Sequence, residues 1–183
     1  WISDICHAMN MKNNKKGIGL IEIVIYAGLL AMISVLLVNF LMQVINTYYM
    51  VRTEREVIGQ GRAAIETVHK TIAQAQSVYA PTSAFGIDSG QLSLVTTQGA
   101  IAGHATAYMD FWVENGRLWI RREGELPMAL TGTSVNVTQF KLERVVQALG
   151  VQAVRTTLHI EYARLKFAAS TTLYATSAIR GNY

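Results

Sequence analysis

Residues 18–51 read IGLIEIVIYAGLLAMISVLLVNFLMQVINTYYMV, a stretch in which Glu22 is the only charged residue. A bilayer core about 30 Å thick is crossed by roughly 20 apolar helical residues, so a membrane span fits within this stretch. From Arg52 onwards the sequence mixes polar and apolar residues as a globular domain does. We therefore expect two parts, a single membrane-spanning helix and a soluble head.

The composition limits what the head can be. The chain has 183 residues, 51% of them hydrophobic and 15% charged, a length that suits one globular domain. Its net charge is +4, and removal of residues 1–17 would leave +2 and no basic stripe, so we predict no nucleic-acid partner. The single cysteine, Cys6, precedes Gly17, so we expect neither a disulfide framework nor a zinc cluster after that point.

Basic residues flank the apolar stretch on both sides. Lys12, Lys15 and Lys16 precede it without an acidic neighbour, whereas Arg52 and Arg55 follow it among acidic residues. Basic flanks favour the cytoplasmic side of a membrane. This asymmetry predicts that the N-terminus lies in the cytoplasm and the head lies outside it.

The residues before the apolar stretch are treated separately because targeting segments are often removed. The chain opens with Trp1 rather than methionine, so we expect the true start at Met11. The segment from Met11 to Gly17 is short, basic and ended by glycine. An ordinary secretory signal carries its apolar region before the cut, and here the apolar residues follow. Two alternatives remain, an uncleaved anchor or a cut on the cytoplasmic side.

Glu22 distinguishes these alternatives. An unpaired acid in a membrane helix costs about 2–3 kcal/mol at mid-bilayer and less near the interface, and a generic anchor gains nothing from it. The run KKGIGLIE at residues 15–22, continued by the apolar stretch, resembles the type IV prepilin signal.

This resemblance implies a set of processing and assembly residues. Prepilin peptidase would cut between Gly17 and Ile18 and methylate Ile18. Glu22, the fifth mature residue, would pair with the amino terminus of a neighbouring subunit, so that two groups costly in lipid satisfy each other. Ile18 stands where the family more often has Phe, and Gly19 where Thr is common. Major pilins commonly carry a proline in the membrane helix, and its absence before Pro81 favours a minor pilin or pseudopilin.

The resemblance also implies domains, partners and a location. Upstream residues and leader would cover 1–17, a long helix 18–80 with its membrane span at about 18–45, and a β-rich head 81–183. The partners would be prepilin peptidase, membrane lipid before assembly, other pilins or pseudopilins through the N-terminal helix, and the inner-membrane assembly platform. The chain would be a single-pass protein of the bacterial inner membrane and then part of a pilus or pseudopilus. A narrower similarity, to J-type pseudopilins of type II secretion and W-type minor pilins, rests on chain order and Arg and Gln spacing.

Helical periodicity continues beyond the span. We expect the helix to run to about Ser77 and to be closed by Pro81, with a bend or local melting at Gly59 and Gly61. An apolar stripe with a helical period should pack on the head's own sheet; its members are Val51, Ile58, Ile65, Val68 and Ile72.

After Pro81 the pattern changes to short β segments, some of which alternate between apolar and polar residues. An Asn115-Gly116 pair between two such segments predicts a tight hairpin. One long helix followed by strands predicts an α+β, pilin-like fold with the helix packed on an antiparallel sheet. The expected strands are 91–97, 108–113, 117–122, 135–146, 156–165 and 171–179.

No catalytic constellation is evident, so we predict that the protein is not an enzyme and needs no cofactor or metal. The four histidines lack metal-ligand spacing, and His159 falls on the polar face of a strand as a solvated residue. Asp88 and Asp110 lie beside turn or strand-end sequence, where Asp serves backbone geometry. Trp112 and Trp119, on opposite arms of the hairpin, would form either an exposed ligand-binding pair or cross-strand packing.

Three functions therefore remain open. The first is a structural subunit, a minor pilin or pseudopilin of a type IV pilus or type II secretion pseudopilus. The second is a tip adhesin or DNA-uptake pilin. The third is a single-pass membrane-anchored protein of unrelated role, and Glu22 argues against it because only assembly gives that acid a purpose.

Overall fold

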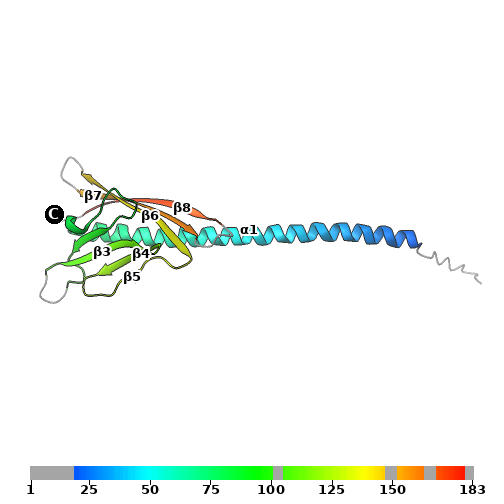
Figure 1. Cartoon of the computed structure of the whole chain (residues 1–183), viewed down its shortest axis with the longest axis horizontal. Helices are drawn as coiled ribbons and strands as arrows, with labels where there is room; N and C mark the ends of the chain where they lie inside the picture. Colours follow the sequence, from blue (N-terminus) through cyan, green and yellow to red (C-terminus); the bar gives the residue numbers. More distant parts are fainter. Residues whose placement is uncertain (1–18, 101–104, 147–151, 163–167, 180–183) are drawn as a thin grey trace, which may run out of the picture. The chain divides into compact units, whose positions relative to one another are not determined.

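The computed structural model describes residues 19–100, 105–146, 152–162 and 168–179 (Figure 1). The chain divides into two compact units between Ile45 and Asn46. The first unit holds the apolar part of the helix, and the second holds the rest of the helix together with all the strands.

One helix, α1 (Leu20–Gln74), runs for 55 residues without interruption. The predicted end is three residues too late, and Pro81 does not terminate the helix because it lies in a separate 3-10 turn, η1 (Ala80–Thr82). Instead the Gln76 amide donates a hydrogen bond of 2.8 Å to the Val95 carbonyl. This bond draws the chain into sheet pairing immediately after the helix.

The part of α1 in the second unit is amphipathic. Ile65, Val68 and Ile72 are buried as predicted, but Val51 and Ile58 are exposed. The prediction failed there because a seven-residue step drifts by about 20° per heptad around a helix of 3.6 residues per turn. The observed buried face recurs at shorter steps and consists of Thr53, Val57, Gly61, Ala64, Ile65, Val68 and Ile72.

An antiparallel sheet of five strands follows, in the order β1-β2-β3-β4-β5. The expected strands at 91–97, 108–113 and 117–122 are confirmed, and the hairpin turn between the last two is confirmed by positive φ angles at Asn115 (51°) and Gly116 (69°). Two further strands of two residues each are too short to give an alternating pattern. The five strands are β1 (Ser77–Val78), β2 (Leu92–Thr96), β3 (Ala107–Glu114), β4 (Arg117–Arg122) and β5 (Met128–Ala129).

A second antiparallel sheet contains three strands in chain order, so the single predicted sheet is divided into two. Its strands are β6 (Val135–Val146), β7 (Gln152–Tyr162) and β8 (Ser170–Ala178). They confirm the expected strands, although β7 begins four residues early and residues 163–165 lie outside the described part. The alternation predicted in β7 is confirmed, since Leu158 and Ile160 are fully buried.

The two sheets meet through the loop before β2. The Phe140 amide donates to the Asp88 carbonyl at 2.7 Å, and the Gly90 amide donates to the Phe140 carbonyl at 2.8 Å. A Cβ on Gly90 would lie 2.6 Å from the Phe140 carbonyl oxygen, so this approach requires glycine.

Gly61 brings α1 close to the three-stranded sheet. A Cβ at this position would lie 2.7 Å from Leu173 Cδ1 and 3.2 Å from Ile160 Cδ1. The helix continues through Gly59 and Gly61, so the local melting expected there is absent. Gly61 therefore serves close packing.

One hydrophobic core joins the second part of α1 to both sheets. Phe111 of β3 and Phe140 of β6 are the largest of its fully buried side chains. The α+β class, with one long N-terminal helix contacting antiparallel sheets, is thereby confirmed.

Candidate functional site

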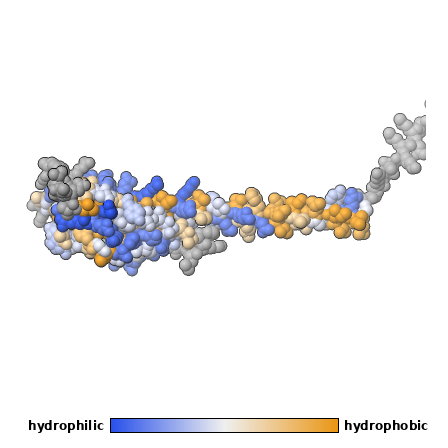
Figure 2. All heavy atoms as spheres, turned by 90° about the horizontal axis from the view of Figure 1, so that it is seen from above, coloured by the Kyte–Doolittle hydropathy of each residue, from blue (hydrophilic) through white to orange (hydrophobic). Residues whose placement is uncertain are grey.

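The first unit offers an apolar helical surface. Its large apolar side chains are exposed, from Leu20 (81%) and Ile21 (74%) to Ile45 (47%). Figure 2 shows hydrophobic atoms along this part of the helix on the face in view. A helix that is apolar all round is expected within a membrane or among other helices.

This is the one helix in the described part of the chain that is long and apolar enough to cross a membrane. Residues 20–45 alone extend about 39 Å at 1.5 Å per residue, more than a bilayer core of about 30 Å. A membrane anchor or a signal segment both agree with these dimensions.

Glu22 lies in the first turn of α1 and is exposed. Acidic side chains are favoured there because the helix macrodipole is positive at its N-terminus. The Tyr26 hydroxyl donates a long hydrogen bond of 3.4 Å to Glu22 Oε1. The expected cleavage residues Gly17 and Ile18 lie outside the described residues.

A polar clamp fixes α1 to the turn before β6. Gln60 Oε1 accepts from the Gly132 amide at 2.7 Å, and Gln60 Nε2 donates to Ser134 Oγ at 2.8 Å. Ser134 Oγ donates in turn to Glu56 Oε1 at 2.8 Å, and Gln60 Nε2 also donates to that oxygen at 2.7 Å. These bonds, from Ser134 first and then Gln60, lower the pKa of Glu56.

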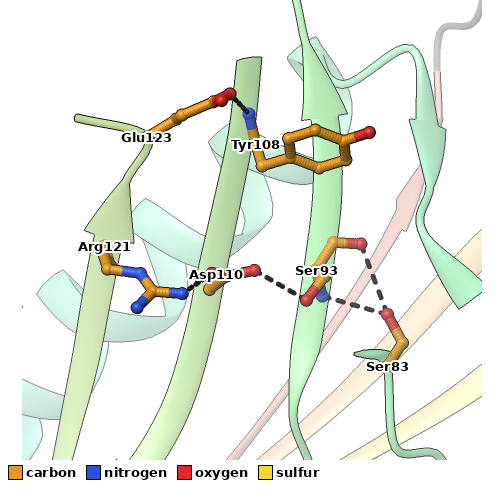
Figure 3. Close-up of polar contacts among 6 residues, drawn as sticks. All are labelled: Ser83, Ser93, Tyr108, Asp110, Arg121 and Glu123. Atoms are coloured by element: carbon orange, nitrogen blue, oxygen red, sulfur yellow. Dashed lines mark hydrogen bonds and ion pairs between the residues drawn. The ribbon is translucent and has the colours of Figure 1, made fainter. Parts of the chain in front are cut away.

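A second group of polar contacts lies on the outward face of the five-stranded sheet (Figure 3). This polar row consists of Ser83, Ser93, Asp110 and Arg121. Asp110 lies inside β3, where its two oxygens accept hydrogen bonds from Ser93 Oγ and Arg121 Nη2, both at 2.7 Å. The Ser93 amide donates to Ser83 Oγ at 3.0 Å. The turn or strand-end role predicted for Asp110 is therefore wrong, because its side chain joins neighbouring strands.

The two tryptophans of the hairpin pack against each other. The Trp112 and Trp119 rings are stacked, with centroids 6.5 Å apart and planes 14° apart. Arg121 lies over Trp112 at 5.9 Å and Arg117 over Trp119 at 5.0 Å. Of the two predicted alternatives, the structure supports cross-strand packing.

The polar row was not predicted from the sequence, although the sequence does predict the register of the hairpin arms that form part of it. An Asn115-Gly116 turn fixes the pairing of the hairpin arms, which places Asp110 opposite Arg121 and Trp112 opposite Trp119. No local sequence pattern predicts the clamp, because Gln60 and Ser134 are 74 positions apart.

The remaining expected polar residues have structural contacts. His159 is half-buried, with Nδ1 2.7 Å from Thr172 Oγ1 and Nε2 3.3 Å from Glu161 Oε1. Its ring is therefore less solvated than predicted. Asp88 Oδ1 accepts a hydrogen bond from Gln139 Nε2 at 2.7 Å, and the Asp88 backbone carbonyl accepts one from the Phe140 amide of β6. Within the described ranges, no group of three or more His, Cys, Asp and Glu residues is placed to hold a metal ion.

Comparison with protein-family models, curated proteins and solved structures gives no match. The architecture itself, a long apolar N-terminal helix whose later turns pack on antiparallel sheets, is pilin-like.

Proposed function

We propose that this chain is a minor pilin or pseudopilin, a structural subunit of a type IV pilus or type II secretion pseudopilus. The observation that carries the proposal is a charge in an unfavourable place. Glu22 is the only charged residue between Gly19 and Val51, in a part of the helix whose exposed side chains are mostly apolar.

The helix surface suits two successive environments. In the membrane, lipid covers the exposed apolar side chains of residues 20–45. In a filament, the same side chains pack against the helices of other subunits, and only van der Waals packing and polar pairing distinguish the two states. An acidic side chain near the start of the helix provides polar pairing that favours the filament.

Glu22 acts as the pairing group. Its carboxylate meets the methylated amino terminus at Ile18 of a neighbouring subunit, and the two opposite charges satisfy each other outside water. The long bond from Tyr26 leaves Glu22 free to take this stronger, charge-assisted partner.

The head has a structural role in this proposal, and we propose no enzymatic activity for it. The clamp around Gln60 and the apolar face from Val57 to Ile72 hold the later turns of α1 in the head core. The partners are prepilin peptidase, other pilins or pseudopilins and the inner-membrane assembly platform.

Mass analysis tests the processing step. The protein is co-expressed with a prepilin peptidase, beside Gly17→Ala as the control. We expect a mature chain that begins at methylated Ile18, and an uncut chain in the control. A leader that survives in the presence of active peptidase would leave an uncleaved anchor of unrelated role.

Assembly is tested separately with Glu22→Leu. This variant should still be cut and should insert in the membrane, but its incorporation into sheared filaments or pseudopili should fall. Glu54→Leu, an exposed acid beyond the span, serves as the matched control. Equal incorporation of Glu22→Leu and the wild type would contradict the role of Glu22.

A further inference from the structure

A pocket opens on the outward face of the five-stranded sheet, and Asp110 and Arg121 of the polar row are part of its lining. Its volume is about 540 Å³, within the range of about 300–1,000 Å³ typical of small-molecule sites. The lining comes from β3, β4, the turn after β4 and the η1 region. All of these elements belong to the second unit.

Two tyrosines supply apolar surface to this pocket. The Tyr79 and Tyr108 rings meet edge to face, with centroids 5.1 Å apart and planes 71° apart. They remain 37% and 41% exposed. In the described part of the chain, neither phenol hydroxyl has a hydrogen-bond partner, so both are available to a ligand.

The polar groups of the pocket are held in place. Asp110, whose side chain is only 15% exposed, is fixed by Ser93 and Arg121, and Figure 3 shows this row beside Tyr108. Glu123 Oε2 accepts from the Tyr108 amide at 2.9 Å. Arg121 uses Nη2 for Asp110, and its guanidinium carries further N–H donors in the lining of the pocket.

The charges at the pocket balance. Its lining contains two acidic residues and two arginines, so an anion meets Asp110 and Glu123 and a cation meets Arg121 and Arg122. A neutral ligand avoids both repulsions. Fixed donors and acceptors beside exposed ring edges and faces suit a ligand with many hydroxyl groups and C–H surfaces between them.

We propose that this pocket binds a short neutral oligosaccharide. Sugar hydroxyls take hydrogen bonds from Arg121 and from the tyrosine hydroxyls and donate to Glu123, while a pyranose C–H face rests on Tyr108. The stacked tryptophans are not the platform, because each ring already contacts the other ring and an arginine. This proposal does not depend on the role of α1.

The test uses the full chain in dodecylphosphocholine micelles, because maltoside detergents carry a sugar headgroup. Maltotriose, cellotriose and triacetylchitotriose are titrated and followed by saturation-transfer difference NMR. We expect at least one of them to bind with a dissociation constant of about 1 mM, typical of a shallow, open site. Inorganic phosphate is titrated in parallel as the anion probe.

Tyr108→Ala should weaken the binding roughly tenfold or more, because it removes the ring that stacks on the sugar. Tyr79→Ala is the second variant in case Tyr108→Ala disturbs β3, and circular dichroism checks the fold of both. Tyr174→Ala is the matched control, since Tyr174 is 72% exposed on β8 in the other sheet.

Three results would overturn the proposal. One is the absence of binding by all three trisaccharides at about 20 mM, well above the expected dissociation constant. Another is unchanged binding by folded Tyr108→Ala and Tyr79→Ala. The last is displacement of a bound trisaccharide by phosphate, which would identify an anion site at the arginines. A failure here leaves the cleavage and assembly tests unaffected.

Discussion

The side-chain amide of Gln60 donates a hydrogen bond of 2.8 Å to the hydroxyl of Ser134, although the two residues are 74 positions apart. Gln60 also accepts from the Gly132 amide, so one side chain of α1 satisfies a donor and an acceptor of the turn before β6. Gly132 permits this approach, since a Cβ there would lie 3.1 Å from Gln60 Oε1. The helix is thereby fixed in register against the head.

Gln60→Leu should destabilise the head. The substitution leaves the half-buried Gly132 amide and the Ser134 hydroxyl without their Gln60 partner, which costs about 1–3 kcal/mol. Urea unfolding in micelles, followed by circular dichroism, measures the change. Gln74→Leu, at the exposed end of the same helix, should stay within about 0.5 kcal/mol of the wild type. Equal stability of the two variants would show that the clamp adds nothing.

Glu56 should make the stability of the head depend on pH. Hydrogen bonds from Ser134 and Gln60 lower the pKa of Glu56 in the folded state, so the unfolded chain binds the proton more readily. The stabilisation is therefore full above the unfolded pKa of about 4.3 and is lost as the pH falls through the lower folded value. Glu56 is exposed, so the effect is small.

Urea midpoints of wild type and Glu56→Gln at neutral and acid pH test this sign. The wild type should be the more stable at pH 7, and the difference should shrink on acidification. A difference that grows toward acid pH would contradict the lowered pKa. Glu54→Gln, an exposed neighbour on the same helix, controls for net charge.

Gly61→Val should destabilise the head by overpacking. The first added carbon already lies 2.7 Å from Leu173 Cδ1, and excess volume in a packed core costs about 1–3 kcal/mol. Gly59→Val is the matched control: nothing lies within 4 Å of its Cβ position, and replacing a helical glycine gains up to about 0.5 kcal/mol. Thermal unfolding should therefore shift in opposite directions for the two variants.

Gly116→Ala should weaken the hairpin. Gly116 has a φ of 69°, and a Cβ there would collide with the Asn136 side chain, so both backbone strain and sterics oppose alanine. We expect a loss of about 1–3 kcal/mol, measured by urea unfolding. Asn115→Gly, at the other residue of this turn with a positive φ, should be tolerated, and similar losses for both variants would place the cause elsewhere.

Much of the fold is readable from the sequence because its elements are local. Short β segments in the sequence locate the strands from β2 to β8, apart from the two-residue β5; alternation is clear in β6 and β7, and the Asn-Gly pair fixes the hairpin register. The division into two sheets is not readable, since it depends on backbone contacts between Gly90 and Phe140. The predicted helix face is wrong at Ile58, because a seven-residue step drifts around a helix of 3.6 residues per turn.

The candidate sites divide in the same way. Glu22 is found from one unusual charge, and its role in assembly remains a prediction, as does cleavage between Gly17 and Ile18. The pocket depends on Tyr79 and Tyr108 meeting from different elements, which no local pattern indicates. The role expected of Asp110 from its residue type is wrong, because the hairpin register pairs this residue with Arg121.

The contact of Gly61 with Leu173 has a consequence for the order of events during biosynthesis. Each strand pairs with a neighbour in the chain, so the hairpins can form as they emerge. The helix α1 is made early, yet the Leu173 side chain that approaches Gly61 belongs to β8, the last of the described strands. We therefore expect the surface of α1 at Gly61 to lack its Leu173 contact until β8 has been synthesised, a period in which the exposed apolar face of the helix can bind a chaperone.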